Sequence, residues 1–337
     1  MRSDFKKECE ELVEECKRFL TDNREWEERY SDYATGILNN HEKKMNARNL
    51  FRQVKSLYLY SCVSKAYTGG NGVEYDLRFA GQSVATLKIN KNGVTINTKD
   101  KDANNKKYFT LSNGMSPNSL DDIWTSKQAQ EFKVFFRDHK EELSKNVKMP
   151  EHRVENELLI SLSSHTSHRN ITPVKIAGAY FQMPTSFRGS DKKEVSYSGN
   201  SGGGIDILAR VTHGSNADNR FAVMELKDEN KSSEPQKDVL LQAIKYATFM
   251  AYLFKSKSGY NWLKILNPKT KAKSVPEQLN IDVVSVMPKG ETDILEGNEE
   301  DEYILVDDNV RLHLYSLFFD SNDINNFSGT FANVIKK

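Results

Sequence analysis

The apolar run FAVMEL at residues 221–226 most constrains how this chain can fold, because five of its six residues are apolar. A run of this length, bounded by charged residues, is typical of a buried strand. Similar strand-like runs occur at 205–211 and 281–288, and an apolar-striped helix is predicted over 234–256 between the last two strands. Strands that alternate with helices predict an α/β fold in which a mixed sheet is flanked by helices.

The flanking residues extend this pattern in both directions. A helix is predicted over 151–163 and a strand over 174–183, followed by the Gly-rich loop RGSDKKEVSYSGNSGGG at 188–204. The run VRLHLYSLFF at 310–319 predicts a further strand. Ser233 and Gln236 have the spacing of a capping box at the start of the 234–256 helix.

The first part of the chain has a different pattern. Helices are predicted over 4–32 and about 36–66, and a small antiparallel meander over 73–99, where apolar and polar residues alternate. A polar loop at 99–107 and a helix at about 118–145 follow. Pro150 marks a boundary, so we predict an N-terminal helical and antiparallel-β domain at 1–148, for recognition or dimerisation, and a second domain at 149–337.

Composition excludes several classes of protein. The 337 residues are 37% hydrophobic and carry a net charge of +1, which is unlike a dedicated histone-like binder. No apolar run reaches the roughly 18 residues of a membrane span, and the charged N-terminus is unlike a signal peptide. We therefore expect a cytoplasmic protein without a membrane partner. No phosphate-binding loop or dinucleotide fingerprint occurs in the sequence.

Two charged residues stand at the end of the central strand. Glu225 and Lys227 are two apart, so their side chains are predicted to lie on one face. Asp206 begins the preceding strand, and if the two strands are neighbours its carboxylate meets that of Glu225. Carboxylates are the ligands of hard cations such as Mg²⁺ or Mn²⁺, and the carbonyl of Leu226 is the expected third ligand. Lys227 would then assist the attacking water and offset charge on a phosphate.

These residues resemble the PD-(D/E)XK nuclease superfamily. GID at 204–206 followed by ELK at 225–227 is similar to its signature, with Ile205 in place of the proline. QAIKY at 242–246 is similar to the Q-x-x-x-Y motif of its RecB-type members. The resemblance covers about residues 150–290 and implies a restriction-endonuclease-like core that cleaves DNA with Mg²⁺.

The superfamily implies a third acid on the helix before the sheet. Glu151, Glu155 and Glu157 are the candidates. Helical periodicity places Glu155 on the apolar face with Val154 and turns Glu157 away, so we predict Glu155 as a catalytic metal ligand and keep Glu157 in reserve. The same segment resembles archaeal Holliday-junction resolvases of this superfamily.

The resemblance also implies roles on the following helix. Gln242 is expected to position the lysine, the water or the DNA backbone, and Tyr246, one helical turn later, to contact a phosphate. Arg188, Lys192 and Lys193 in the Gly-rich loop are predicted to contact nucleic acid. Cationic segments at 88–107 and 267–274 could extend such a groove.

Simpler interpretations remain open for each feature. An E-x-K pair can be a solvated strand edge, Gln242 a polar helix flank, and Tyr246 a core residue. The Gly-rich loop can be a flexible lead-in, and the lysine runs solvated loops. The N-terminal helices fit a helical hairpin or the contact of a homodimer.

The sequence predicts a metal-dependent nuclease that hydrolyses phosphodiester bonds, with DNA expected rather than RNA by analogy with the superfamily. The alternative from another class is a catalytically silent module of the same fold that binds nucleic acid or a protein partner. A third possibility is an unrelated α/β domain in which the motifs match by accident.

Overall fold

A computed structural model gives the fold of the chain. The structure describes residues 3–41, 45, 56–61, 63, 73–90, 93–147, 150–163, 168–189, 195–197, 203–213, 218–228, 234–290, 293–295 and 303–336. The chain forms two compact units: unit 1 comprises Met1–Ala34, Leu158–Val174 and Gln182–Lys337, and unit 2 comprises Thr35–Glu157 and Lys175–Phe181.

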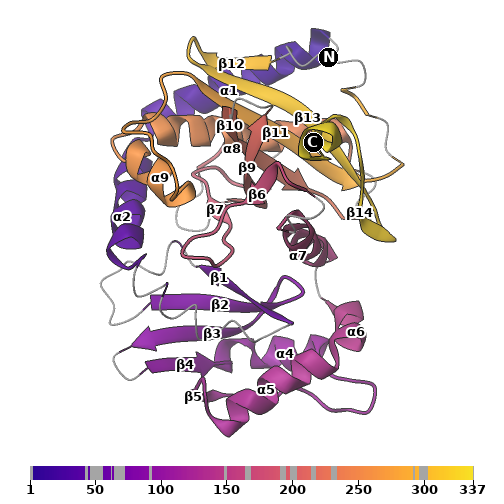
Figure 1. The fold of residues 1–337 in the computed structure, drawn as a ribbon. Coiled ribbons are helices and arrows are strands. Elements are labelled where there is room, and N and C mark those ends of the chain that lie inside the picture. Colours follow the sequence, from indigo (N-terminus) through magenta and orange to yellow (C-terminus); the bar gives the residue numbers. More distant parts are fainter. Residues whose placement is uncertain are drawn as a thin grey trace. The chain divides into compact units, whose positions relative to one another are not determined.

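Unit 1 is built on a seven-stranded mixed sheet in the order β12-β13-β11-β10-β9-β6, with β14 paired to β13 (Figure 1). The strands β10 and β13 run parallel to β11, whereas the other pairs are antiparallel. The strand bounds are β6 Ile171–Pro173, β9 Ile207–His213, β10 Asp218–Leu226, β11 Leu279–Pro288, β12 Tyr303–Asp307, β13 Val310–Asp320 and β14 Asp323–Ser328. The prediction of an α/β fold with a mixed sheet is confirmed.

Helices cover the two faces of this sheet. The long helix α8 (Gln236–Lys255) covers one face, where Phe254 stacks on Phe221 of β10 with ring centroids 5.1 Å apart. The short helix α10 (Thr330–Lys336) covers the other face, where Phe331 contacts Tyr315 of β13. The helix α9 (Gly259–Leu266) follows α8 directly. Buried apolar side chains between these layers form the core of unit 1.

The two units divide the chain differently from the predicted boundary at residue 148. Helix α1 (Ser3–Asp22) packs on α8, and Trp26 and Tyr30 of α2 (Glu25–Asn39) contact Phe249 of α8 at 5.5 and 4.8 Å between ring centroids. The Trp262 indole donates to the Tyr30 carbonyl at 3.1 Å. The apolar stripes of the N-terminal helices are therefore buried against α8, so residues 1–34 belong with the second half of the chain.

Unit 2 contains a five-stranded antiparallel sheet in the order β1-β2-β3-β4-β5. Its elements are β1 Leu57–Ser61, β2 Val73–Phe79, β3 Gln82–Asn90, β4 Gly93–Asn97, β5 Asp121–Ile123, α4 Asp102–Tyr108, α5 Lys127–Asp138 and α6 Lys140–Leu143. The aromatic residues of α5 pack on the sheet, and Phe136 lies 5.0 Å from Phe79 between ring centroids. The predicted meander is confirmed.

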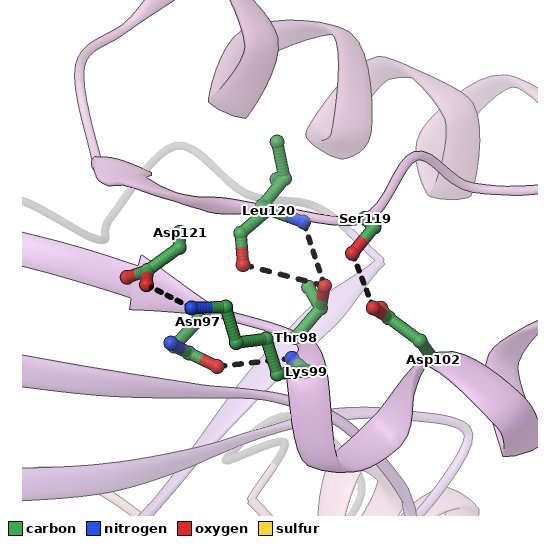
Figure 2. A network of polar contacts seen from close by, with 7 residues as sticks. All are labelled: Asn97, Thr98, Lys99, Asp102, Ser119, Leu120 and Asp121. Atoms are coloured by element: carbon green, nitrogen blue, oxygen red, sulfur yellow. Dashed lines mark hydrogen bonds and ion pairs between the residues drawn. The ribbon is translucent and has the colours of Figure 1, made fainter.

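Polar contacts join the end of β4 to β5 (Figure 2). The hydroxyl of Thr98, which is fully buried, accepts from the Leu120 N–H at 2.7 Å, and Lys99 pairs with Asp121 at 2.7 Å. The segment predicted as a polar loop at 99–107 is instead a 3₁₀ turn, Lys99–Lys101, that continues into α4. Within α4, the buried Asn105 amide donates to the Val84 carbonyl of β3 at 2.8 Å.

Three other sequence predictions differ from the structure. Within the range 36–66 that was expected as one helix, α2 ends at Asn39, His41 and Met45 are again helical, and Leu57–Ser61 form β1, which pairs with β2. The strand expected over 174–183 is interrupted by a turn in which Ala177 and Gly178 adopt φ of 48° and 77°. The helix at 118–145 is shorter, because β5 takes its first residues. No helix among the described residues is long and apolar enough to span a bilayer.

Candidate functional site

The acid and the lysine at the end of β10 lie together and are buried. Oε1 of Glu225 lies 3.5 Å from Nζ of Lys227, as the two-residue spacing predicts. The two residues are 2% and 6% exposed, so the interpretation as a solvated strand edge is wrong. They lie on the face of β10 that carries Phe221, which is the face that α8 covers.

Asp206 reaches the same place from the neighbouring strand. It forms the bend between β8 (Gly204–Ile205) and β9, and the antiparallel register that pairs Ile207 with Met224 leads to Glu225 one residue further on. Oδ2 of Asp206 accepts a hydrogen bond from the Leu226 N–H at 2.9 Å. The N–H and C=O of a strand residue point toward the same neighbouring strand, so the Leu226 carbonyl also faces the Asp206 side.

Gln242 and Tyr246 of α8 contact each other beside these acids. Nε2 of Gln242 donates to the Tyr246 hydroxyl at 3.2 Å, as the four-residue spacing predicts. Burial raises the pKa of Tyr246, and the negative charges of Glu225 and Asp206 raise it further. The phenol therefore stays protonated and lies within electrostatic reach of both carboxylates.

The backbone of the Gly-rich loop packs on the Tyr246 hydroxyl. A Cβ added at Gly203 would lie 2.4 Å from this oxygen and 2.8 Å from the Gly189 backbone, and one added at Gly189 would lie 3.1 Å from the hydroxyl. Gly203 has no space for a side chain, and a Cβ at Gly189 would require the hydroxyl to move by a few tenths of an ångström. The glycines that border the loop therefore have a packing role at Tyr246, which a purely flexible lead-in would not require.

We expect Gly203→Ala to destabilise unit 1, because the new methyl group overlaps the Tyr246 hydroxyl and the Gly189 backbone. Overpacking of this kind costs about 1–3 kcal/mol. Gly204→Ala is the matched control, since its Cβ would meet atoms no nearer than 3.5 Å. Urea unfolding of both variants measures the difference. Equal unfolding midpoints for the two variants would show that the loop moves without loss of stability and that its backbone does not hold the Tyr246 hydroxyl in place.

The cations predicted to contact nucleic acid are only partly placed. Arg188 is exposed, and its N–H donates to the Ser196 carbonyl at 3.0 Å. It directly precedes Gly189, so its backbone lies next to the Tyr246 hydroxyl. Lys192 and Lys193 lie outside the described residues.

A buried polar network next to Glu225 was not predicted from the sequence. Ser285 of β11 is the register partner of Glu225, and its hydroxyl accepts from Nε2 of Gln236 at 3.1 Å. The same amide donates to Asp293 at 3.1 Å, and the hydroxyl of Ser316 donates to the other carboxylate oxygen of Asp293 at 2.5 Å. The acid Asp293 is distant in sequence from every motif, so no local signal indicates it.

The capping-box prediction for α8 is wrong. The helix begins at Gln236 after Pro235, which makes no side-chain cap, and the Gln236 amide contacts Ser285 and Asp293 instead. Ser233 lies outside the described residues. Gln236 is 2% exposed, and its role is therefore to fill a buried polar position rather than to cap the helix.

The helix α7 (Pro150–Leu162) carries the third predicted acid. Glu155 is 2% exposed, whereas Glu157 is partly exposed and pairs with Arg153 at 3.1 Å, so the predicted inward and outward orientations are confirmed. In unit 2, Glu155 interacts with Arg78 and Tyr60. Burial by itself would lower the pKa of Arg78, but the charges of Asp76 and Glu155 raise it above its usual value. A role for Glu155 as a metal ligand stays a prediction.

Glu155→Gln is expected to destabilise unit 2 by about 1–3 kcal/mol, because it removes a buried charge that stabilises Arg78. Glu157→Gln is the matched control, and the loss of its i,i+4 ion pair is expected to cost at most about 0.5 kcal/mol. Urea unfolding midpoints of the two variants give the comparison. A larger effect for Glu157→Gln would mean that α7 packs by its other side.

The burial of the acid–lysine pair has a physical cost. Transferring two charges from water into a protein interior is unfavourable, and their mutual attraction offsets this only in part. A pair of this kind at the end of a strand, next to a second carboxylate, is therefore more typical of a functional site than of a structural one. Comparison of the chain with protein-family models, with curated proteins and with solved structures finds no match, so the geometry alone supports the functional conclusion.

Proposed function

We propose that unit 1 is a metal-dependent nuclease of the PD-(D/E)XK type that hydrolyses phosphodiester bonds in DNA. The observation that carries this proposal is the buried Glu225–Lys227 pair, with the Asp206 carboxylate bound to the Leu226 N–H beside it. The placement of these residues at the start of β9 and the end of β10, and of Gln242 and Tyr246 on α8, supports it. The strand order β9, β10, β11 has the antiparallel and then parallel pairing expected of such a core.

The donor set fits a small hard cation that needs few protein ligands. Among the described residues there is no group of three or more His, Cys, Asp or Glu side chains that could hold a metal ion. The proposed ligands are therefore the carboxylates of Asp206 and Glu225 and the carbonyl of Leu226, with water completing the shell. Mg²⁺ commonly keeps several waters and binds through one or two carboxylates, and Mn²⁺ has similar preferences.

When bound there, Mg²⁺ supplies a Lewis acid for the phosphate and lowers the pKa of a water molecule. The side chains of the site contribute the rest. The Lys227 ammonium orients the attacking water and stabilises the negative charge that develops on the phosphate. As the water oxygen bonds to phosphorus, the bond from phosphorus to the leaving oxygen breaks. In this proposal, Gln242 and the neutral Tyr246 hydroxyl donate hydrogen bonds to a phosphate.

A second candidate is a catalytically silent module that binds nucleic acid. The exposed Arg188 beside the loop favours binding of a polyanion whether or not cleavage follows. The clustered carboxylates count against this alternative, because they would repel phosphate unless a cation lies between them. The two functions therefore differ in what a divalent cation does: a nuclease cuts with it, and a silent module only binds more tightly.

The experiment that separates them incubates the purified chain with linear, circular and single-stranded DNA, and with RNA. Each substrate is tested with Mg²⁺, with Mn²⁺ and with EDTA. The proposal expects cleavage with either cation and none with EDTA. Binding without cleavage under every condition would support the silent module and contradict the nuclease.

A further inference from the structure

A pocket of unit 1 lies well away from the acid–lysine pair. It has a volume of about 290 Å³, and its walls come from β9, β10, α8, α9 and the segment 267–281. Arg220, in its wall, precedes Glu225 on the same strand by five residues, which corresponds to about 16 Å along the strand. The proposed nuclease site does not use this pocket.

One arginine, Arg210, gives the pocket its charge. Arg210 lies opposite Phe221 in the register of β9 with β10, and its Nη1 donates to Oδ1 of Asn267 at 2.8 Å. Its Nε is buried and makes no hydrogen bond to any described residue. Burial lowers the pKa of Arg210. The Arg210 guanidinium has five N–H donors. Among the described residues, its hydrogen-bond partner is the neutral side-chain amide of Asn267.

No acidic side chain of the described pocket wall balances Arg210. None of the described residues that line the pocket is Asp or Glu. Arg220 precedes Phe221 on β10, so its side chain points to the opposite face of the sheet, where it pairs with the fully buried Asp282 at 3.5 Å. The segment over the pocket adds exposed lysines at Lys269 and Lys271. The electrostatic potential inside the pocket therefore favours an anion.

Apolar side chains form the remaining wall. Phe221 and Phe254 stack at 5.1 Å, with their rings inclined by 32°, and Leu263 and Ile281 lie beside them. Cationic groups next to flat apolar surface suit a ligand that has both an anionic group and a ring. The volume lies at the lower end of the range of small-molecule sites, which corresponds to a ligand of about mononucleotide size.

We propose that this pocket binds a small organic phosphate that carries a planar ring, such as a nucleoside monophosphate. The phosphate lies against Arg210, and the ring lies against Phe221 and Phe254. Arg210 recognises the phosphate by its planar fork of N–H donors. This site does not depend on the nuclease activity, and its ligand requires no metal.

Isothermal titration calorimetry in EDTA tests the site without contributions from a cation at Asp206 and Glu225. The probes are AMP, CMP, GMP and UMP, together with inorganic phosphate and adenosine as the two separate halves of AMP. At least one monophosphate is expected to bind tenfold or more tightly than either half. Arg210→Gln should weaken that binding about 10- to 100-fold, as expected for a lost charge-assisted hydrogen bond.

Two further variants make the result decisive. Lys269→Gln removes one positive charge from the segment without touching the pocket wall, and is expected to change the Kd by less than about twofold. Asn267→Asp gives Arg210 an internal carboxylate and should remove binding even if Arg210→Gln fails to fold. The proposal is overturned if no monophosphate binds at up to about 5 mM. It is also overturned if inorganic phosphate binds as tightly as the nucleotides, or if Asn267→Asp binds like the wild type.

Discussion

Lys227→Met is expected to lower the rate of DNA cleavage by two to three decades while Mn²⁺ binding stays near that of the wild type. In the proposed mechanism Lys227 is not a metal ligand, so its replacement removes the cation that faces the reacting phosphate and leaves the proposed metal ligands in place. Groups that stabilise developing charge in this way contribute about 3–4 kcal/mol to the transition state in other enzymes. Methionine keeps the length of the side chain in a position that is 6% exposed.

The loss of Lys227 also leaves Glu225 without its partner at 3.5 Å, and stability must be separated from catalysis. The double variant Glu225→Gln/Lys227→Met removes both charges and should recover part of the stability but none of the activity. Lys255→Met is the matched control, because Lys255 pairs with Asp307 at a position where both side chains are well exposed. Its cleavage rate is expected to equal that of the wild type.

Rates are measured under single-turnover conditions, with DNA binding measured in Ca²⁺ at the same salt concentration. Binding is expected to change little, because one phosphate contact among several contributes modestly to affinity. Cleavage by Lys227→Met at the rate of Lys255→Met would show that the lysine has no part in the reaction.

Asp206→Asn is expected to abolish the stabilisation of the chain by Mn²⁺. A cation that binds only the folded state raises the free energy of unfolding by about 2.7 kcal/mol at a hundredfold excess over its Kd. Asn keeps an oxygen that can accept from the Leu226 N–H, so the metal-free stability should change by less than about 1 kcal/mol. Without metal, Asp206→Asn is expected to have an unfolding midpoint near that of the wild type. Added Mn²⁺ is expected not to raise this midpoint.

Thermal unfolding with increasing Mn²⁺, and with EDTA, gives this comparison. Glu225→Gln should also lose the shift, since it removes the other proposed carboxylate ligand. Asp307→Asn is the control, because Asp307 is a surface acid of the same unit that pairs with Lys255. A full Mn²⁺ shift in Asp206→Asn would place the cation elsewhere on the chain.

The sequence predicted the placement of the side chains at β10 and α8 well, because this placement depends on local periodicity. Alternation along a strand places Glu225 and Lys227 on one face, and helical spacing places Gln242 next to Tyr246, wherever the strand and helix lie. The orientation of Glu155 followed from the apolar stripe of α7 for the same reason. Burial of the pair could not be read from the charges, because it depends on α8 covering that face.

Features that depend on distant contacts were not predicted. Asp293 joins Gln236 and Ser316 only after β11 and β13 have paired, and no motif indicates it. The N-terminal helices were assigned to the first domain because Pro150 marks the predicted boundary, and an apolar stripe does not indicate which distant helix it packs on. The pocket around Arg210 has the same origin, since its walls come from five separate segments.

The cation site is tested most directly by crystals of the chain grown or soaked in Mn²⁺ and measured at a wavelength where manganese scatters anomalously. The account predicts an anomalous peak between the carboxylates of Asp206 and Glu225 and the carbonyl of Leu226, with metal–oxygen distances of about 2.0–2.3 Å. An anomalous peak held by other residues, with neither of these carboxylates bound to it, would contradict the proposed metal site and the nuclease mechanism that depends on it.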